Sequence, residues 1–181
     1  MSGNEYKKLD HRLVYKGHIV DFYEDDIMLE NGNVVHWDYV SHNGAAAVLP
    51  VDGDGNIIMV RQYRIGTGTM LLEIPAGGMK PGEDPYECAV RELEEETGYM
   101  SDNVKHLIDV NSAPAYTSET VYIYYAEGLK KTNTNYDEDE IIEIETYTLS
   151  ELVSMVMAGE ITDSKTIAAI LAYNQLKNGQ K

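Results

Sequence analysis

The chain has 181 residues, of which 14 are Lys or Arg and 31 are Asp or Glu, so its formal net charge is −17. This length suits one compact domain with a buried core, and an apolar fraction of 43% excludes wholesale disorder. The negative charge argues against nucleic acid as a partner, because phosphate backbones are bound through clustered Lys and Arg. A small phosphorylated substrate is compatible with it where metal ions screen the repulsion.

The sequence contains few signals of location. The longest apolar run, residues 45–49, is far too short to span a bilayer, so we expect no membrane partner. Residues 1–12 lack the apolar stretch that a signal peptide requires. Cys88 is the only cysteine, which excludes an internal disulfide and makes the reducing cytoplasm the expected location.

The N-terminal part of the chain has the pattern of strands. Polar and apolar side chains alternate over residues 1–43, which predicts a small antiparallel β region there. Asn31 and Gly32 favour a two-residue hairpin turn within it. Residues 44–181 are then expected to form a second domain.

Two apolar runs, residues 44–51 and 56–64, predict the first strands of that domain. The acidic loop between them begins like a calcium-binding loop. Its sixth and twelfth positions are Ile57 and Tyr63, however, where such a loop requires Gly and Glu. We therefore predict a hairpin at this point.

A helix with clear boundary signals follows residues 69–78, which are predicted to be a strand that runs into a loop. Asp84 can cap it, Pro85 suits the first helical position, and Glu87 stands three residues after the cap. Gly98 is a natural end. The sequence therefore predicts a helix between Asp84 and Gly98.

The rest of the chain mixes strands and helices without a regular alternation. Strands are expected within residues 104–116 and 118–129, around a loop with proline, and an acidic loop leads into another strand within 135–149. Two helices are expected at the end, one after Ser150 ending near Gly159 and one from Asp163 to Lys177. This order predicts an α/β sandwich on a mixed sheet.

Three glutamates of the first helix, Glu92, Glu95 and Glu96, stand at helical spacings i, i+3 and i+4 and share one face. Arg91 can relieve part of their repulsion through Glu95 or Glu87. Apolar side chains expected to bury against the sheet are Tyr86, Ala89, Val90 and Leu93. The concentrated negative charge predicts a site for a hard divalent cation such as Mg²⁺, the alternative being an ordinary solvated helix face.

The spacing around this helix resembles the signature of the Nudix hydrolases. The matching residues are Gly77, Glu83, Arg91, Glu92, Leu93, Glu95, Glu96 and Gly98. Tyr99, where an aliphatic residue is usual, is the only departure and concerns packing. The resemblance implies a Nudix-type α/β/α sandwich on a mixed sheet, preceded by a small antiparallel sheet.

The resemblance also implies roles for the matching residues. Members hydrolyse a nucleoside diphosphate linked to another moiety, using Mg²⁺, Mn²⁺ or another divalent ion. Carried over residue by residue, the implied metal ligands are Glu92, Glu95, Glu96 and the main-chain carbonyl of Ala76, with Glu95 and Glu96 also counted as catalytic. Arg91 and Glu83 are implied to orient the platform, and Gly77 and Gly98 to shape it.

Other segments resemble the ADP-ribose and ADP-sugar pyrophosphatase subclass. Glu119 follows Pro114 by five residues, as in a substrate-binding loop of that subclass, although Ala113 and Ala115 depart from its pattern. The alternative is a plain proline turn. Arg64 ends a segment in which the subclass contacts substrate phosphate, and a fork-shaped guanidinium suits that task. Its alternative is a strand-end charge without special role.

Two further parts of the resemblance concern an acidic run and an aromatic residue. Glu138 is implied to handle the attacking water and Glu140 to reach a metal, although the two could be exchanged or merely solvated. Trp37 is implied to stack on adenine across a homodimer formed by the N-terminal sheet, with His18, or Ile19 and Phe22 nearby, on the other face of the base. A tryptophan in a strand is otherwise more often part of a core.

The expected function is the Mg²⁺-dependent hydrolysis of ADP-ribose to AMP and ribose 5-phosphate by an activated water. Cys88 is interpreted as a core thiol rather than a nucleophile. One alternative is a pyrophosphatase for another nucleoside diphosphate sugar. The other is a non-catalytic metabolite sensor, against which the complete set of glutamates argues.

Overall fold

The computed structural model describes residues 6–132 and 142–179. The chain divides into two compact units, Met1–Asn43 with Asn111–Glu119 and Gly44–Val110 with Thr120–Lys181. The first unit therefore includes a second segment, Asn111–Glu119, which the sequence pattern did not predict. The separate roles expected for the two domains stay predictions.

The first unit is a three-stranded antiparallel sheet in the order β1 (Lys7–Lys16), β2 (Asp21–Met28) and β3 (Val34–Ser41). Strands β2 and β3 pair as far as Met28 and Val34, so five residues connect them rather than the predicted two. Gly32 has φ 82°, and its N–H donates to the carbonyl of Leu29 at 2.9 Å. The turn lies where the sequence predicted it, but it is longer than two residues. The hydrogen bond that closes it runs from the Leu29 N–H to the Asn33 carbonyl.

The second unit contains two larger sheets. A four-stranded sheet has the order β7-β4-β10-β9 and a three-stranded sheet the order β12-β5-β6. The strands are β4 (Ala45–Pro50), β5 (Ile57–Arg64), β6 (Thr69–Glu73), β7 (Ala76–Gly78), β9 (Asn103–Asn111), β10 (Thr120–Glu127) and β12 (Glu143–Tyr147), with β8 (Tyr99–Met100) and β11 (Lys130–Lys131) forming a short ladder. Strand β4 runs parallel to β10 and antiparallel to β7, so the sheet is mixed.

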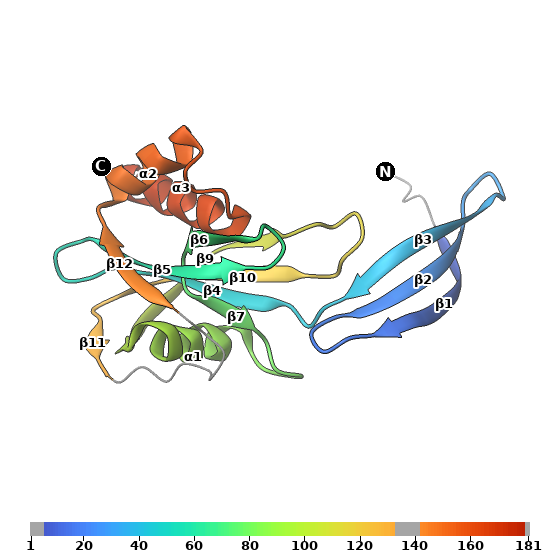
Figure 1. The fold of residues 1–181 in the computed structure, drawn as a ribbon, viewed down its shortest axis with the longest axis horizontal. Coiled ribbons are helices and arrows are strands. Elements are labelled where there is room, and N and C mark those ends of the chain that lie inside the picture. Colours follow the sequence, from blue (N-terminus) through green and yellow to red (C-terminus); the bar gives the residue numbers. More distant parts are fainter. Residues whose placement is uncertain (1–5, 133–141, 180–181) are drawn as a thin grey trace. The chain divides into compact units, whose positions relative to one another are not determined.

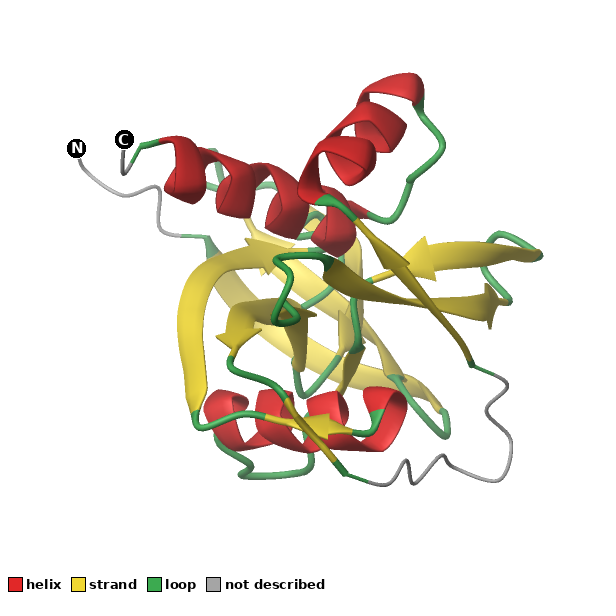
Figure 2. Cartoon of the chain, turned by 90° about the vertical axis from the view of Figure 1, so that its left-hand side faces the viewer, coloured by secondary structure: helices red, strands yellow, loops and turns green. Residues whose placement is uncertain are grey.

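Helices cover both sides of these strands. In Figure 1, α1 (Pro85–Thr97) lies on one side, and α2 (Leu149–Ala158) and α3 (Ser164–Asn178) lie on the other. Figure 2 shows the same layers from another direction. The α/β/α sandwich predicted from the sequence is therefore observed. Within residues 6–132 and 142–179, none of the helices combines the length and the apolar character that a membrane crossing requires.

Strand β4 explains why residues 45–49 are continuously apolar. Ala46 and Val48 belong to a cluster with α1, whereas Ala47 and Leu49 belong to the cluster under α2 and α3. Successive side chains of a strand point to opposite faces, so a strand buried on both faces needs apolar residues at every position. All four side chains are fully buried.

The acidic loop after β4 is a tight turn, as expected. The Asp52 carboxylate accepts hydrogen bonds from the N–H groups of Asp54 and Asn56 at 2.9 and 2.8 Å. Only the bridge between Val51 and Ile57 joins the flanking strands at the turn, and β4 and β5 then belong to different sheets. The predicted hairpin is therefore correct as a turn but wrong as a strand pair.

Candidate active site

Helix α1 begins and ends where the sequence predicted. Asp84 is the N-cap and accepts the N–H of Tyr86 at 2.9 Å, and Pro85 is the first helical residue. Gly98 ends the helix with φ 69° and donates its N–H to the carbonyl of Glu94. These caps fix which residues face the sheet.

The apolar face of α1 differs in part from the prediction. Cys88, Ala89 and Leu93 are fully buried, whereas Val90 is half-buried. Tyr86 is 42% exposed, so its predicted burial is wrong. It lies in the first turn, at the margin of the helix–sheet contact, where its ring meets Tyr124 edge to face at 6.0 Å. Cys88 lies in the core as interpreted, and burial raises the pKa of its thiol to about 12.

Two of the three glutamates turn inward. Glu92 is 7% exposed and Glu96 is 3% exposed, whereas Glu95 is half-exposed. A Glu96 carboxylate oxygen accepts the N–H of Ala76 at 3.0 Å. A Cβ added to Gly77 would lie 2.0 Å from a Glu92 carboxylate oxygen, so only glycine permits this approach. An ordinary solvated face is therefore excluded for Glu92 and Glu96.

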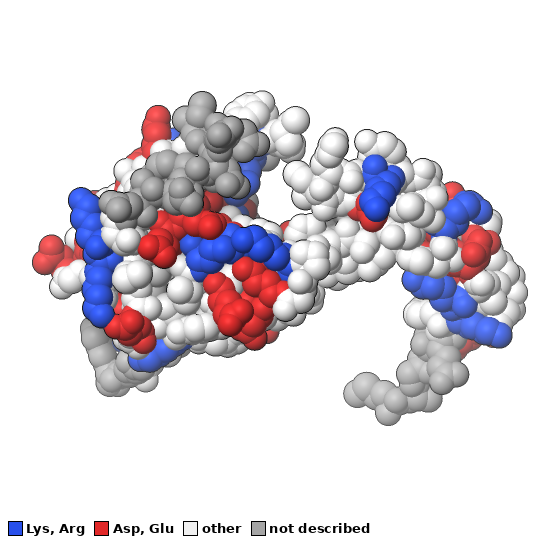
Figure 3. Space-filling view, turned by 90° about the horizontal axis from the view of Figure 1, so that it is seen from below, with Lys and Arg blue, Asp and Glu red and all other residues white. Residues whose placement is uncertain are grey.

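Arg91 organises the outer part of the cluster. Its guanidinium donates to Glu83 at 2.9 Å and to Glu95 at 2.8 Å, and it also pairs with Glu92. The bond from Arg91 lowers the pKa of Glu83 to about 2. Of the two partners offered by the sequence, Glu95 is the one observed. In the space-filling view from below, acidic side chains (red) and basic side chains (blue) lie next to one another on this face of the molecule (Figure 3).

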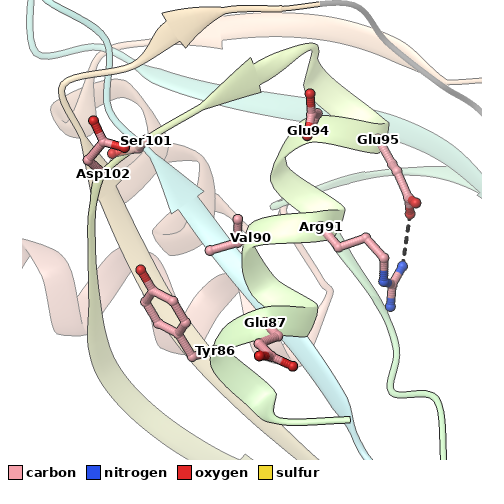
Figure 4. Close-up of a pocket in the computed structure, with 8 residues that line it drawn as sticks. All are labelled: Tyr86, Glu87, Val90, Arg91, Glu94, Glu95, Ser101 and Asp102. Atoms are coloured by element: carbon pink, nitrogen blue, oxygen red, sulfur yellow. Dashed lines mark hydrogen bonds and ion pairs between the residues drawn. The ribbon is translucent and has the colours of Figure 1, made fainter.

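A hollow of about 780 Å³ lies on the outer side of α1 (Figure 4). Its lining residues are Tyr86, Glu87, Val90, Arg91, Glu94, Glu95, Ser101 and Asp102. The ion pair between Arg91 and Glu95 lies at its edge. Because the buried Glu92 and Glu96 do not line it, this hollow is not the space above the inward carboxylates.

Arg64, predicted to contact phosphate, ends β5 and forms a two-pronged ion pair with the buried side chain of Glu73. Its Nε and Nη2 donate to the two carboxylate oxygens of Glu73, each at 2.8 Å. Glu73 was not predicted from the sequence, although an acidic residue between the apolar Leu72 and Ile74 is a usable signal.

The remaining predicted substrate residues belong to the first unit. Trp37 in β3 is 47% exposed and contacts the Tyr6 ring edge to face at 5.7 Å. His18 is exposed in the turn between β1 and β2, whereas Trp37 pairs with Asp25 in the middle of the sheet. The Glu119 carboxylate lies 3.6 Å from His42 Nδ1. Their predicted roles stay predictions.

Glu138 and Glu140 lie outside the described residues, so their predicted roles also stay predictions. A cluster that the sequence analysis missed lies on the N-terminal sheet, where ligand atoms of Glu24, Asp26 and His36 are within 4.8 Å of one another. Local pairing explains it, because His36 bonds Asp26 at 2.6 Å and Arg12 pairs with Glu24.

The donors around Gly77 fit a divalent cation. Glu92, Glu95 and Glu96 offer only carboxylate oxygens, which hard cations prefer. Burying anionic groups costs free energy unless a positive charge compensates them. The absence of a side chain at Gly77 leaves room for the Glu92 carboxylate beside the loop. The chemistry of these side chains therefore fits a divalent cation, and their roles as metal ligands stay predictions.

Comparison with known proteins decides the family, since the NUDIX domain matches residues 41–170. The chain belongs to the Nudix family. Across 179 residues it is 38% identical to the "Methanol dehydrogenase activator" of Bacillus methanolicus and 37% identical to the "ADP-ribose pyrophosphatase" of Bacillus subtilis (strain 168). Each alignment covers 98% of this chain and 96% of the relative. The prediction of a Nudix hydrolase resembling ADP-ribose pyrophosphatases is therefore confirmed.

A solved structure supports the fold. The "Crystal structure of ADP compounds hydrolase" superposes with a TM-score of 0.87 over 99% of this chain and 98% of that chain, at 24% identity. The Nudix-type α/β/α sandwich with its N-terminal sheet is therefore confirmed as the fold.

Proposed function

We propose that this Nudix hydrolase cleaves the pyrophosphate of ADP-ribose to AMP and ribose 5-phosphate, with Mg²⁺ or Mn²⁺ held by Glu92, Glu95, Glu96 and the Ala76 carbonyl. The observation that carries the proposal is the inward placement of Glu92 and Glu96 against the loop at Gly77. The 37% identical relative named ADP-ribose pyrophosphatase supports the choice of substrate.

In the proposed reaction, side chains of this protein bind the substrate, orient the glutamates and position the attacking water. Arg64 binds a phosphate oxygen, and Arg91 fixes the glutamates through its bonds to Glu83 and Glu95. A bound divalent ion would supply charge neutralisation and make water more acidic. Glu138 would position the attacking water or accept its proton. Water adds to one phosphorus, the anhydride P–O bond breaks, and the bridging oxygen leaves with the other phosphate.

The N-terminal sheet would complete the site in a homodimer, with Trp37 and His18 contacting adenine and Glu119 the rest of the substrate. Trp37 is half-exposed in the single chain, which leaves its ring available to a base. We place the enzyme in the cytoplasm, the compartment that suits a chain whose single cysteine is unpaired.

A second candidate function is action on another enzyme. It is favoured by the 38% identical relative named methanol dehydrogenase activator. Adding the protein to a methanol dehydrogenase and measuring the rate of methanol oxidation tests this candidate.

Steady-state hydrolysis of ADP-ribose, ADP-glucose, UDP-glucose, GDP-mannose and NADH at fixed Mg²⁺ tests the proposal. We expect ADP-ribose to lead in kcat/KM by about tenfold or more, a difference of about 1.4 kcal/mol. Glu96→Gln should lower that rate by more than about 100-fold, since it removes a proposed ligand. The matched variant Glu87→Gln, at an exposed position of the same helix, should keep it. Undiminished hydrolysis by Glu96→Gln would refute the metal platform.

A further inference from the structure

Glu73 is a carboxylate in the interior of the Nudix domain, at the end of β6. Its side chain is 1% exposed. Both oxygens accept from Arg64 at 2.8 Å, and Lys165 of α3 donates to Oε2 at 2.5 Å. Burial alone raises the pKa of Glu73, but the bonds from Arg64 and Lys165 outweigh burial and hold it below its usual value. Glu73 is therefore an ionised carboxylate shared by two cations.

The first turn of α3 also contacts Glu73 and the residue after it. Asp163 caps the helix, accepting the Thr166 N–H at 3.0 Å and Lys165 Nζ at 3.0 Å. The Thr166 hydroxyl donates to Asp163 at 2.6 Å and accepts the N–H of Ile74 at 3.0 Å. The helix end thus binds the Glu73 side chain and the backbone directly after it.

The same short segment leads to the proposed metal ligands. Three residues after Glu73, the N–H of Ala76 donates to Glu96. The Glu73 bond raises the pKa of Arg64, and the negative charge of Glu96 contributes to that rise. Arg64 and Glu96 of α1 are therefore electrostatic neighbours, and the short segment from Glu73, which binds Arg64, to Ala76, which binds Glu96, connects them.

The geometry of the ion pair leaves Arg64 able to bind a further acceptor. Glu73 occupies Nε and Nη2, so the guanidinium plane is fixed while Nη1 is not used by this pair. Lys165 shares the charge of Glu73, so Arg64 is less fully neutralised than in an isolated pair. A fixed cation loses little conformational entropy when it binds a phosphate oxygen.

We propose that Glu73 is a positioning residue for hydrolysis, which holds Arg64 so that Nη1 receives a phosphate oxygen of the diphosphate, with Lys165 and Asp163 tying this placement to α3. This inference rests on the proposed function, in which Arg64 binds the substrate phosphate. The competing explanation is a buried ion pair that only joins α3 to β6, and it makes different kinetic predictions.

The decisive variant is Glu73→Gln, which keeps the side-chain shape and removes the charge. We expect the KM for ADP-ribose to rise about tenfold, with kcat within about threefold and Mn²⁺ affinity unchanged, because binding rather than chemistry is weakened. In an Arg64→Met background, Glu73→Gln should change kcat/KM by less than about twofold, because a residue acting through Arg64 has no further effect once Arg64 is gone.

A matched control lies on the same strand. Arg61 in β5 and Glu145 in β12 form a similar pair, Nε to Oε1 at 2.5 Å and Nη2 to Oε2 at 3.3 Å. Glu145→Gln should leave kcat/KM within about twofold of the wild type. Lys165→Met, which keeps the pair of Arg64 and Glu73, should raise KM about threefold and thus tests the inference if Glu73→Gln does not fold.

An unchanged KM in either folded variant, or equal losses with and without Arg64, would overturn the inference. Calorimetric binding of ADP-ribose in EDTA reports on Arg64 without turnover. If the wild type does not hydrolyse ADP-ribose but Glu73→Gln still weakens its binding in EDTA, the proposed function alone is refuted. Equal ADP-ribose affinity of an active wild type and Glu73→Gln would refute the positioning role alone.

Discussion

Gly77 is the residue whose role the structure defines most sharply. Because a Cβ there would lie 2.0 Å from the Glu92 carboxylate, Gly77→Ala must displace that side chain or the loop. A displacement of about 1 Å at a catalytic group can cost about 100-fold in rate, and we expect a loss of that size in kcat/KM. Weaker Mn²⁺ binding, measured by calorimetry, should accompany it.

Gly78 provides the control for this prediction. A Cβ added there meets nothing within 4 Å. Gly78→Ala should therefore keep kcat/KM within about twofold of the wild type. Equal losses in the two variants would show that general loop rigidity, rather than the space for Glu92, decides the activity.

Glu83 should make stability depend on pH in the acidic range. Its pKa falls from 4.5 to about 2 in the folded protein because Arg91 bonds the ionised form. A lowered folded pKa stabilises the protein above the unfolded pKa and ceases to do so as pH falls through the folded one. Glu83→Gln should therefore cost about 1–3 kcal/mol at pH 7, and the cost should shrink below about pH 4.5.

Urea unfolding of the wild type and Glu83→Gln between pH 7 and pH 3.5 measures this difference. A gap between the two proteins that stays constant over that range would mean that the charge of Glu83 is not what stabilises the fold. A gap that widens toward acid would contradict the sign of the pKa shift.

At the level of elements, the sequence predicted α1 well because its signals are local. Asp84, Pro85 and Gly98 act within one turn of their own positions. Periodicity also placed Glu92, Glu95 and Glu96 on one side of the helix. It could not tell that two of them are buried, because that depends on the approach of the loop at Gly77, which only the tertiary fold creates.

Glu73 is a second residue whose environment could not be predicted from the sequence. Its neighbours in sequence are apolar, and its partners Arg64 and Lys165 stand 9 and 92 residues away. A buried acid is a visible anomaly in a sequence, but pairing at such separations is not visible there. The sequence therefore predicted that Arg64 binds phosphate, but it did not indicate that Glu73 pairs with Arg64.

Helix α2 offers a direct test of local signals. Thr148 and Glu151 form a capping box, so the helix begins before Ser150, where the sequence placed the start. Thr148→Ala should destabilise the protein by about 1 kcal/mol, because an N–H in the first turn loses its acceptor. Ser154→Ala, on the exposed side of the same helix, should change stability by less than about 0.5 kcal/mol. Thermal melting of both variants checks the prediction.

At the scale of the whole molecule, the sequence placed a domain boundary between residues 43 and 44, and the first segment of one compact unit stops at Asn43. Residues 111–119 also group with the N-terminal unit, which the sequence did not predict. The link depends on bonds between Val40 and the segment at Tyr116 and Ser118, more than 70 positions away. Local sequence patterns do not predict hydrogen bonds between residues so far apart in the chain.

The first unit should bring two copies of the chain together. All ten residues of β1 are exposed, among them the apolar Leu9, Leu13 and Tyr15. A three-stranded sheet is stable when its apolar surface is covered, and a second copy would cover it. Light scattering at micromolar concentration should therefore give twice the mass of one chain. Leu13→Asp should shift the protein toward one chain and raise the KM for ADP-ribose, because the proposed adenine site needs both copies.

Met157 supplies the comparison, since it is an apolar residue of α2 that is more exposed than Leu13. Met157→Asp should leave both the mass and the KM unchanged, because nothing in the proposed assembly uses α2. If the wild type has the mass of one chain and still hydrolyses ADP-ribose with the same KM as Leu13→Asp, the adenine site is built within a single chain. Trp37 and His18 would then have to be assigned by separate substitutions, whereas the assignments of Glu92, Glu96 and Arg64 would stand.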